Sequence, residues 1–167
     1  LEIGCLPVID ATVPGNVEID LANAGIIDAD LYKGMATKQN EKWETYDWWY
    51  ETSFIAPEHA CSAQELILRF DGVDCFADYY LNDTLVASSE NAFMQIDVDI
   101  TKHVIWGLEN KLHVHIRSAF LETIQKEYTQ TQIQYHSPFT SAIRKSAHSF
   151  GWDIFPRAVS AGLWKNV

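Results

Sequence analysis

Apolar side chains recur mainly at every second position along this chain. The clearest run covers residues 65–71, where Leu66, Leu68 and Phe70 share one face and the charged residues at 65, 69 and 71 share the other. Because successive side chains of a β-strand point to opposite faces, this alternation predicts a strand with one buried and one exposed face. The same pattern recurs in four further segments: 47–55, 75–81, 94–100 and 111–117. These segments are the predicted framework of the fold.

Two of the predicted strands are joined by a short polar turn. Asn82 and Asp83 both tolerate the positive φ angles of a two-residue hairpin, and residues 84–87 then form the return strand. Asn82-Asp83-Thr84 also matches the acceptor pattern for N-glycosylation, but matches of three residues are frequent by chance. We interpret the segment as a hairpin turn.

Five or more short strands, each with one apolar face, predict antiparallel sheets that share a core. Helix signals are sparse. Asn16 can cap a short helix that ends at Gly25, and a second helix is predicted after Ser118, with Leu121, Ile124 and Tyr128 at helical spacing. The last thirty or so residues have no clean period, although residues 161–167 look like the start of a strand. We therefore predict one all-β domain over residues 1–167, a β-sandwich with one or two short helices.

Composition narrows the classes of function. The 167 residues are 47% hydrophobic and 21% charged, which excludes a disordered polyelectrolyte. The net charge of −11 repels phosphate backbones and anionic lipids, so we expect neither a nucleic-acid nor a membrane partner. No apolar run approaches the roughly 20 residues that span a bilayer. Neutral partners such as sugars remain compatible with this charge.

Most chemical motifs are absent. The sequence lacks the nucleophile elbow G-x-S-x-G, the fingerprint G-x-G-x-x-G and a Walker A loop, so we expect no serine hydrolase and no cofactor. Cys5, Cys61 and Cys75 have no CxxC spacing and are interpreted as small hydrophobic residues. His113 and His115 point to the same side of a predicted strand, but nothing nearby supplies a third ligand. We interpret them as a solvated strand face and expect no metal site.

An aromatic loop near the end of the chain is the candidate site. Trp152 and Asp153 follow Gly151 and precede Arg157, so a flat apolar ring, a hydrogen-bond acceptor and a cation lie close together. Proteins bind sugars with this combination, because the ring packs on C–H groups while the carboxylate accepts hydrogen bonds from hydroxyls. In the alternative interpretation, Trp152 fills the core and Asp153 pairs with Arg157 or Arg144.

A series of short blocks in a fixed order extends over nearly the whole chain: Val13-Pro14-Gly15-Asn16-Val17, Tyr32-Lys33-Gly34, Asp47-Trp48-Trp49-Tyr50, Ala77-Asp78-Tyr79-Tyr80-Leu81-Asn82, Arg144-Lys145, Phe150-Gly151-Trp152-Asp153, Pro156-Arg157 and Gly162-Leu163-Trp164. In this order the blocks resemble the N-terminal domain of the β-mannosidases of glycoside hydrolase family 2. The resemblance implies a jelly-roll, galactose-binding-like sandwich. It also implies that the chain is a fragment of a larger glycosidase, in which an immunoglobulin-like domain and a (β/α)8 barrel follow.

The resemblance further implies retaining hydrolysis by two glutamates on the barrel, so this chain should hold no catalytic residue and be inactive by itself. Trp152 and Asp153 would contact the terminal sugar, a β-mannoside or related β-glycoside, with Arg157 and Arg144 as possible support. The family reads Gly-Trp-Asp-Trp-Gly-Pro-Arg at this loop, whereas Ile154 and Phe155 replace the second Trp and the Gly in this chain. Because Gly tolerates backbone angles that Phe resists, we expect an altered loop.

Two other functions are compatible with these residues. The chain could be a freestanding lectin-like module that binds glycan by itself, or a structural sandwich whose exposed aromatic side chains dock onto neighbouring domains. The structural alternative predicts a sizeable apolar patch near Trp152 and Trp164.

Overall fold

The computed structural model describes residues 6–58, 65–127, 140 and 142–167. The strand pairs found there are antiparallel, and the helices are all short, which confirms the predicted all-β class. No helix in these ranges is long and apolar enough to cross a membrane. In chain order the elements are α1 (Val17–Asn23), α2 (Ala36–Asn40), the 3₁₀ helix η1 (Glu41–Thr45), β1 (Trp48–Ile55), β2 (Ile67–Phe70), β3 (Phe76–Leu81), β4 (Thr84–Glu90), β5 (Ile96–Asp99), β6 (Glu109–Arg117), α3 (Ala119–Ile124) and the 3₁₀ helix η2 (Ala147–Phe150).

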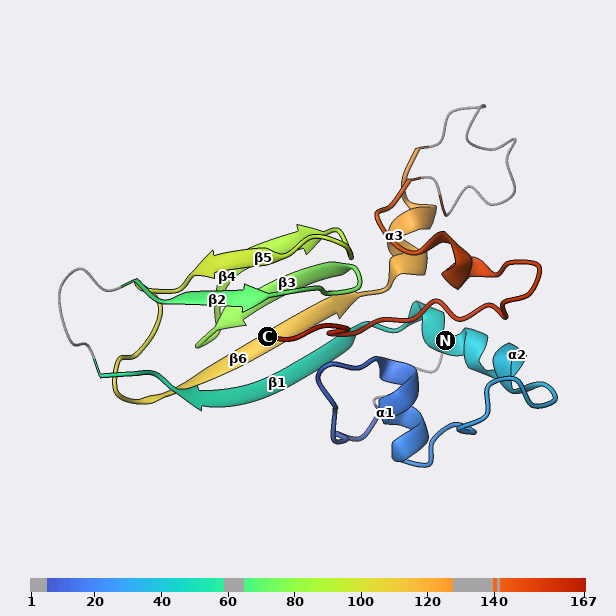
Figure 1. Ribbon diagram of the computed structural model, residues 1–167, viewed down its shortest axis with the longest axis horizontal. Helices are drawn as coiled ribbons and strands as arrows, with labels where there is room; N and C mark the ends of the chain where they lie inside the picture. The colour runs from blue at the N-terminus through green and yellow to red at the C-terminus, as the bar shows by residue number, and fades with distance from the viewer. Residues whose placement is uncertain (1–5, 59–64, 128–139, 141) are drawn as a thin grey trace.

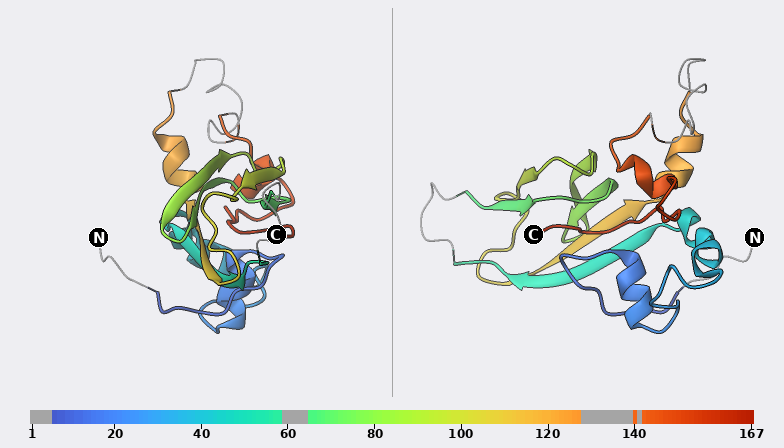
Figure 2. Two further views of the ribbon diagram at one scale, coloured as in Figure 1. Left: turned by 90° about the vertical axis from the view of Figure 1, so that its left-hand side faces the viewer. Right: turned by 45° about the vertical axis from the view of Figure 1, so that its right-hand side comes forward.

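Two sheets enclose the core, as Figures 1 and 2 show. One has four strands in the order β1-β6-β3-β4, and the other pairs β2 with β5. Their inner faces meet in one apolar cluster, in which Phe70 of β2 contacts Tyr79 of β3 with ring centroids 4.4 Å apart. The predicted alternation is confirmed on β6, where Leu112, Val114 and Ile116 are all buried. The apolar alternation therefore identified the sandwich core.

Strand β5 is shorter than the pattern predicted. Ile96 and Val98 pack against the core as expected, but Met94 was also placed on the buried face and is instead 62% exposed. The strand begins only at Ile96, and residues 91–94 form a turn in which Asn91 Oδ1 accepts a hydrogen bond from Phe93 N. An apolar residue in a turn does not follow the alternation of the strand beside it.

The hairpin between β3 and β4 is confirmed. Asn82 and Asp83 have φ angles of 49° and 64°, the left-handed conformation that a tight hairpin requires. The Asn82 amide donates to Asn110 Oδ1 at 2.8 Å and to the His103 carbonyl at 3.2 Å, while its oxygen accepts from Lys111 N. The side chain of Asn82 is thus part of the fold, in agreement with the hairpin interpretation.

Both predicted helices are present. Asn16 Oδ1 accepts from Ile19 N at 3.0 Å at the start of α1, and Ser118 Oγ accepts from Leu121 N at the start of α3. The predicted apolar face of α3 is wrong in part, because Ile124 is 51% exposed; Tyr128 lies outside the described residues. The buried residues of α3 are Ala119 and Thr123. With only six residues, this helix is oriented by its neighbours rather than by its own pattern.

The C-terminal segment runs extended across the sandwich (Figure 1), but it is not a regular strand. Gly162 forms an isolated bridge with Asp74. The carbonyls of Ala161 and Leu163 accept hydrogen bonds from the backbone at residues 17 and 15, and the carbonyl of Asn166 accepts one from a second segment, at residue 71. This segment therefore ties α1 to the start of β3, and it leads directly out of the candidate loop.

Candidate functional site

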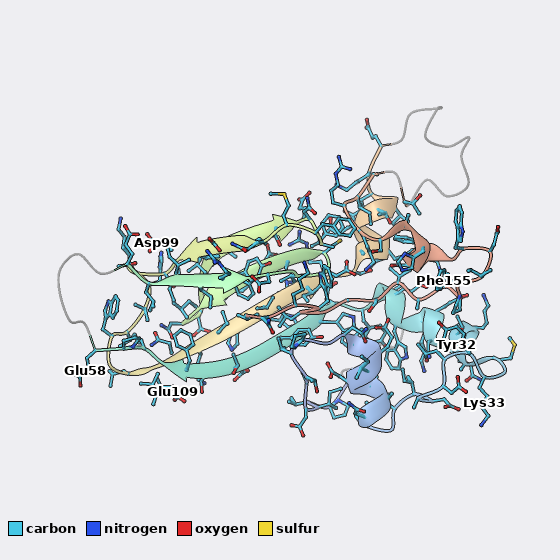
Figure 3. The ribbon with its side chains drawn as sticks, viewed as in Figure 1. Tyr32, Lys33, Glu58, Asp99, Glu109 and Phe155 are labelled. Carbon is cyan, nitrogen blue, oxygen red and sulfur yellow. The ribbon has the colours of Figure 1, made fainter. Side chains whose placement is uncertain are left out.

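The candidate loop lies at one end of the molecule, next to η2 and on the same side as α2 and α3 (Figure 1). Figure 3 shows Phe155 and Tyr32 at this end, whereas Glu58, Asp99 and Glu109 lie at the opposite end. The site is therefore built from loops and short helices rather than from a face of either sheet.

The loop is a tight hairpin. The backbones of Trp152 and Phe155 exchange two hydrogen bonds, both of 3.1 Å, so Asp153 and Ile154 form its tip. Phe155 does not have a positive φ, so the residue that replaces the family glycine needs no left-handed conformation. Its ring contacts His148 of η2, with centroids 5.5 Å apart. The substitution therefore leaves a regular turn that rests on η2.

The tip of the hairpin is exposed. Trp152 is 60% and Ile154 is 79% exposed, and Asp153 is exposed as well. The interpretation of Trp152 as a core residue is thus wrong. Among the described residues, none forms a hydrogen bond or an ion pair with the Asp153 carboxylate. The carboxylate consequently retains its full capacity to accept hydrogen bonds.

Arg157 does not pair with Asp153, as the alternative interpretation required. It forms a two-pronged ion pair with Glu44 of η1, with Nε and Nη2 at 2.8 and 2.6 Å from the two carboxylate oxygens. Its Nη1 also donates to the Phe150 carbonyl at 3.2 Å, and the guanidinium lies over the rings of Phe120 and Phe150. Arg157 therefore lies at the base of the hairpin.

Arg144 has a different place. Its side chain is exposed, and its backbone carbonyl accepts a hydrogen bond of 2.8 Å from Ala92 N. The described contacts do not bring its guanidinium to Asp153. Glu44, by contrast, was missed by the sequence analysis. No spacing links it to Arg157, 113 positions away, and only its aromatic neighbours Trp43 and Tyr46 mark the segment as partly buried.

The cavity behind the hairpin is too small for a sugar. It measures about 20 Å³ and is lined in part by Trp43, Glu44, Pro156 and Arg157. A cavity of this size holds about one water molecule. A wider depression of about 320 Å³ lies between α1, residues 28–31 and residues 158–160. Asp153 lines neither space, so a sugar that reaches it must approach from outside the domain.

A group of buried charges lies where the loop joins the C-terminal segment. The Lys145 ammonium is fully buried and donates to Asp74 Oδ2 and to the Ser160 carbonyl. The Ser160 hydroxyl in turn donates to Glu18 Oε2 at 2.6 Å. Burial raises the pKa of the Glu18 carboxyl, and this hydrogen bond only partly offsets the effect. Burial also raises the pKa of the Asp74 carboxyl, although its contact with Lys145 partly offsets the effect. The group therefore contains carboxylates that are costly to ionise in the folded state.

We expect the Glu18→Gln variant to lose less stability than the parent as the pH rises from about 4.5 to neutrality. The pKa of Glu18 in the folded state is above its unfolded value of 4.5. The contribution of Glu18 to the free energy of unfolding is therefore fully present below pH 4.5, and it is lost as the pH rises through the folded pKa. Urea unfolding at both pH values measures the difference. Glu58→Gln, at an exposed position, is the control, and equal pH slopes for Glu18→Gln and the parent would contradict the prediction.

The two histidines of β6 face carboxylates rather than a common ligand. His115 Nε2 lies 3.0 Å from Asp47 Oδ2, and its ring stacks on Trp49 with centroids 4.2 Å apart. His113 Nε2 lies 3.4 Å from Glu51 Oε2. The described residues contain no group of three or more His, Cys, Asp and Glu side chains that could hold a metal.

Cys75 is a buried free thiol, as expected of a small hydrophobic residue. Burial raises its pKa to about 12, so it is protonated and unreactive at neutral pH. Cys5 and Cys61 lie outside the described residues.

A family model described as the glycosyl hydrolase 2 galactose-binding domain-like family matches residues 4–165. The chain belongs to this family. As a galactose-binding-like domain it has the sandwich that its strand pattern predicted, and the resemblance inferred from the sequence blocks is confirmed.

Relatives of this galactose-binding-like domain are named β-mannosidases. One from Rattus norvegicus is 32% identical over 168 residues, which covers 94% of this chain and 19% of the relative. β-Mannosidase B of Aspergillus clavatus is 29% identical over 160 residues, covering 93% and 19%. The crystal structure of a β-D-mannosidase from Dictyoglomus thermophilum has a TM-score of 0.81 and 28% identity, and again covers 93% of this chain and 19% of that one. The chain thus spans about a fifth of the length of these proteins.

Proposed function

We propose that this chain is the N-terminal, non-catalytic domain of a β-mannosidase-like exoglycosidase and supplies part of the subsite for the terminal sugar. The observation that carries the proposal is the hairpin tip, where Trp152 is exposed and the Asp153 carboxylate has no partner among the described residues. The names of the relatives support the class of substrate, a β-mannoside or related β-glycoside.

In this proposal the bond is broken elsewhere. An immunoglobulin-like domain and a (β/α)8 barrel are its partners, and two barrel glutamates act as nucleophile and acid/base, as the resemblance implies. Asp153 accepts a hydrogen bond from a sugar hydroxyl, while Trp152 offers an apolar face to the ring. A hydrogen bond that strengthens as the sugar distorts lowers the barrier without any contact to the reacting bond.

Replacing Asp153 by alanine in the complete polypeptide is expected to lower kcat/KM on an aryl β-mannoside about 10- to 100-fold, the scale of one lost charged hydrogen bond. Steady-state kinetics measures the effect. Glu58→Ala is the matched control, because it removes an exposed carboxylate at the opposite end of the domain (Figure 3). An Asp153→Ala rate as high as that of the control would remove Asp153 from the subsite.

The two alternative functions differ in what the chain does alone. A lectin-like module would bind mannose or a β-mannoside with millimolar or tighter affinity in calorimetry of the 167-residue chain, whereas a composite subsite would give no signal. A docking role is supported by the exposure of Ile154 and Phe155, which places apolar side chains beside Asp153. Trp164 is 41% exposed and belongs to another contact, since its Nε1 donates to the Ala92 carbonyl. Docking and sugar contact are compatible within one hairpin.

A further inference from the structure

We infer that Glu44 is a positioning residue for the Asp153 hairpin and acts on it through Arg157. The inference rests on the proposed function, because it assumes that the location of Asp153 matters to the terminal-sugar subsite. It adds a residue that lies outside the loop and that no feature of the loop sequence indicates.

The ion pair between Glu44 and Arg157 has a defined geometry. Both oxygens of Glu44 accept from Arg157, and the Glu44 side chain is only 8% exposed. A two-pronged pair fixes the plane of the guanidinium as well as its position, which a single contact to a lysine would not do. Arg157 is therefore held in one orientation.

Arg157 also contacts the backbone from which the chain enters the hairpin. Its third contact is the Phe150 carbonyl, at the last residue of η2 and two residues before Trp152. The intervening residue, Gly151, has a φ of +98°, and the position of its missing Cβ lies 3.7 Å from Arg157 Cβ. The arginine therefore lies against the point where the chain turns from η2 into the hairpin.

Glu44 is itself fixed by a neighbouring element. It lies in η1, and its backbone carbonyl accepts a hydrogen bond from the Ser118 hydroxyl, which also caps α3. The base of the hairpin is thus joined to η1 and α3, and not only to residues of its own loop. A displacement of Glu44 would therefore move Arg157 through the ion pair. Arg157 would in turn displace the backbone that precedes the Asp153 hairpin, through its hydrogen bond to the Phe150 carbonyl.

The experiment uses the complete polypeptide with Glu44→Gln, which keeps the side-chain shape and removes the charge. We expect kcat/KM on an aryl β-mannoside to fall about 10- to 100-fold, because a displacement on the order of 1 Å in a contacting group can cost that much. Hydrogen exchange of the peptide covering residues 151–157 should become faster by about tenfold, since the Trp152 and Phe155 amides donate the hairpin hydrogen bonds.

Two controls separate positioning from loss of stability. Asp97→Asn breaks an ion pair of the same two-pronged geometry on β2 and β5, where Arg69 is the partner. Val98→Ala weakens the core on β5 without a contact to the hairpin. Neither should change exchange at 151–157 selectively. Arg157→Lys retains the charge but not the two-pronged contact. We expect its kcat/KM and its exchange rate at 151–157 to lie between those of the parent and those of Glu44→Gln.

The decisive readout is the combination with Asp153→Ala. If Glu44 acts through the hairpin, adding Glu44→Gln to Asp153→Ala lowers kcat/KM by less than about twofold further, because the group it positions is already gone. Losses that multiply overturn the inference. The inference is also overturned if hydrogen exchange at 151–157 is unchanged in Glu44→Gln, or if exchange rises equally throughout the domain. It is overturned as well if exchange at 151–157 alone becomes faster while kcat/KM is unaltered. If Asp153→Ala alone has no effect, the proposed function fails, and the exchange data still report whether Glu44 holds the hairpin.

Discussion

Replacing Asp74 by alanine is expected to destabilise the domain by about 3–5 kcal/mol, the usual cost of removing one partner from a buried ion pair. The Lys145 side chain has no exposed surface, and its ammonium donates to Asp74 and to the Ser160 carbonyl. Without Asp74 the positive charge stays buried, and among the described residues the Ser160 carbonyl is its remaining acceptor. Denaturant unfolding measures the loss, which should appear as a lower midpoint with an unchanged slope.

The source of this loss can be separated from simple removal of a side chain. Adding Lys145→Met removes the unpaired charge, so the double variant should be more stable than Asp74→Ala alone. Asp97→Ala is the matched control, because it breaks the exposed pair with Arg69 and should change stability little. A loss below about 1 kcal/mol for Asp74→Ala would show that Lys145 finds other partners.

The strands and turns of this fold could be predicted because their signals are local. An alternation of period two needs only neighbouring residues, and it identified β2 and β6 with their correct buried faces. The Asn82-Asp83 turn and the Asn16 cap are equally local, since the turn depends on the positive φ angles of its own two residues and the Asn16 side chain accepts from a backbone amide three residues further on. Met94 marks the limit of such signals, because an apolar residue just outside a strand fits the same alternation.

The C-terminal segment could not be predicted as it is. Its hydrogen bonds go to residues 15 and 17 in one part of the chain and to residues 71 and 74 in another. A segment that pairs with several partners in turn carries no period of its own. The sequence therefore indicated a strand at 161–167, whereas the segment is extended with only an isolated bridge at Gly162.

The sequence could propose the residues of the candidate site, whose role stays a prediction, but not their geometry. Trp152 and Asp153 were found by type and by resemblance, but whether a tryptophan is buried depends on segments that pack against it. Here the loop closes on itself as a hairpin, and Trp152 stays outside. The partner of Arg157 could not be found because Glu44 is 113 positions away and many carboxylates were available. Pairings at such separations are set by the fold.

Replacing Gly162 by alanine is expected to cost about 3 kcal/mol, because the change combines overpacking with backbone strain. A Cβ at this position would lie 2.8 Å from Asn16 Cα and 2.8 Å from the Gly15 carbonyl oxygen, and both are backbone atoms that cannot rotate away. The φ of +154° adds to the strain. The tail would have to leave Asp74, with which Gly162 exchanges two backbone hydrogen bonds.

Gly25→Ala is the matched control, because Gly25 has a φ of +71° but no atom within 4 Å of the place that a methyl group would take. It should cost only about 1 kcal/mol, the conformational penalty without the clash. Thermal and denaturant unfolding of both variants measure the contrast.

If Gly162→Ala costs no more than Gly25→Ala, the C-terminal segment is not packed closely against residues 15 and 16. The tail then has room to move beside the hairpin. If the contrast holds, the close backbone contact at Gly162 limits how far the segment that follows Arg157 can shift, so the hairpin is held from its C-terminal side as well as by the contact with Glu44.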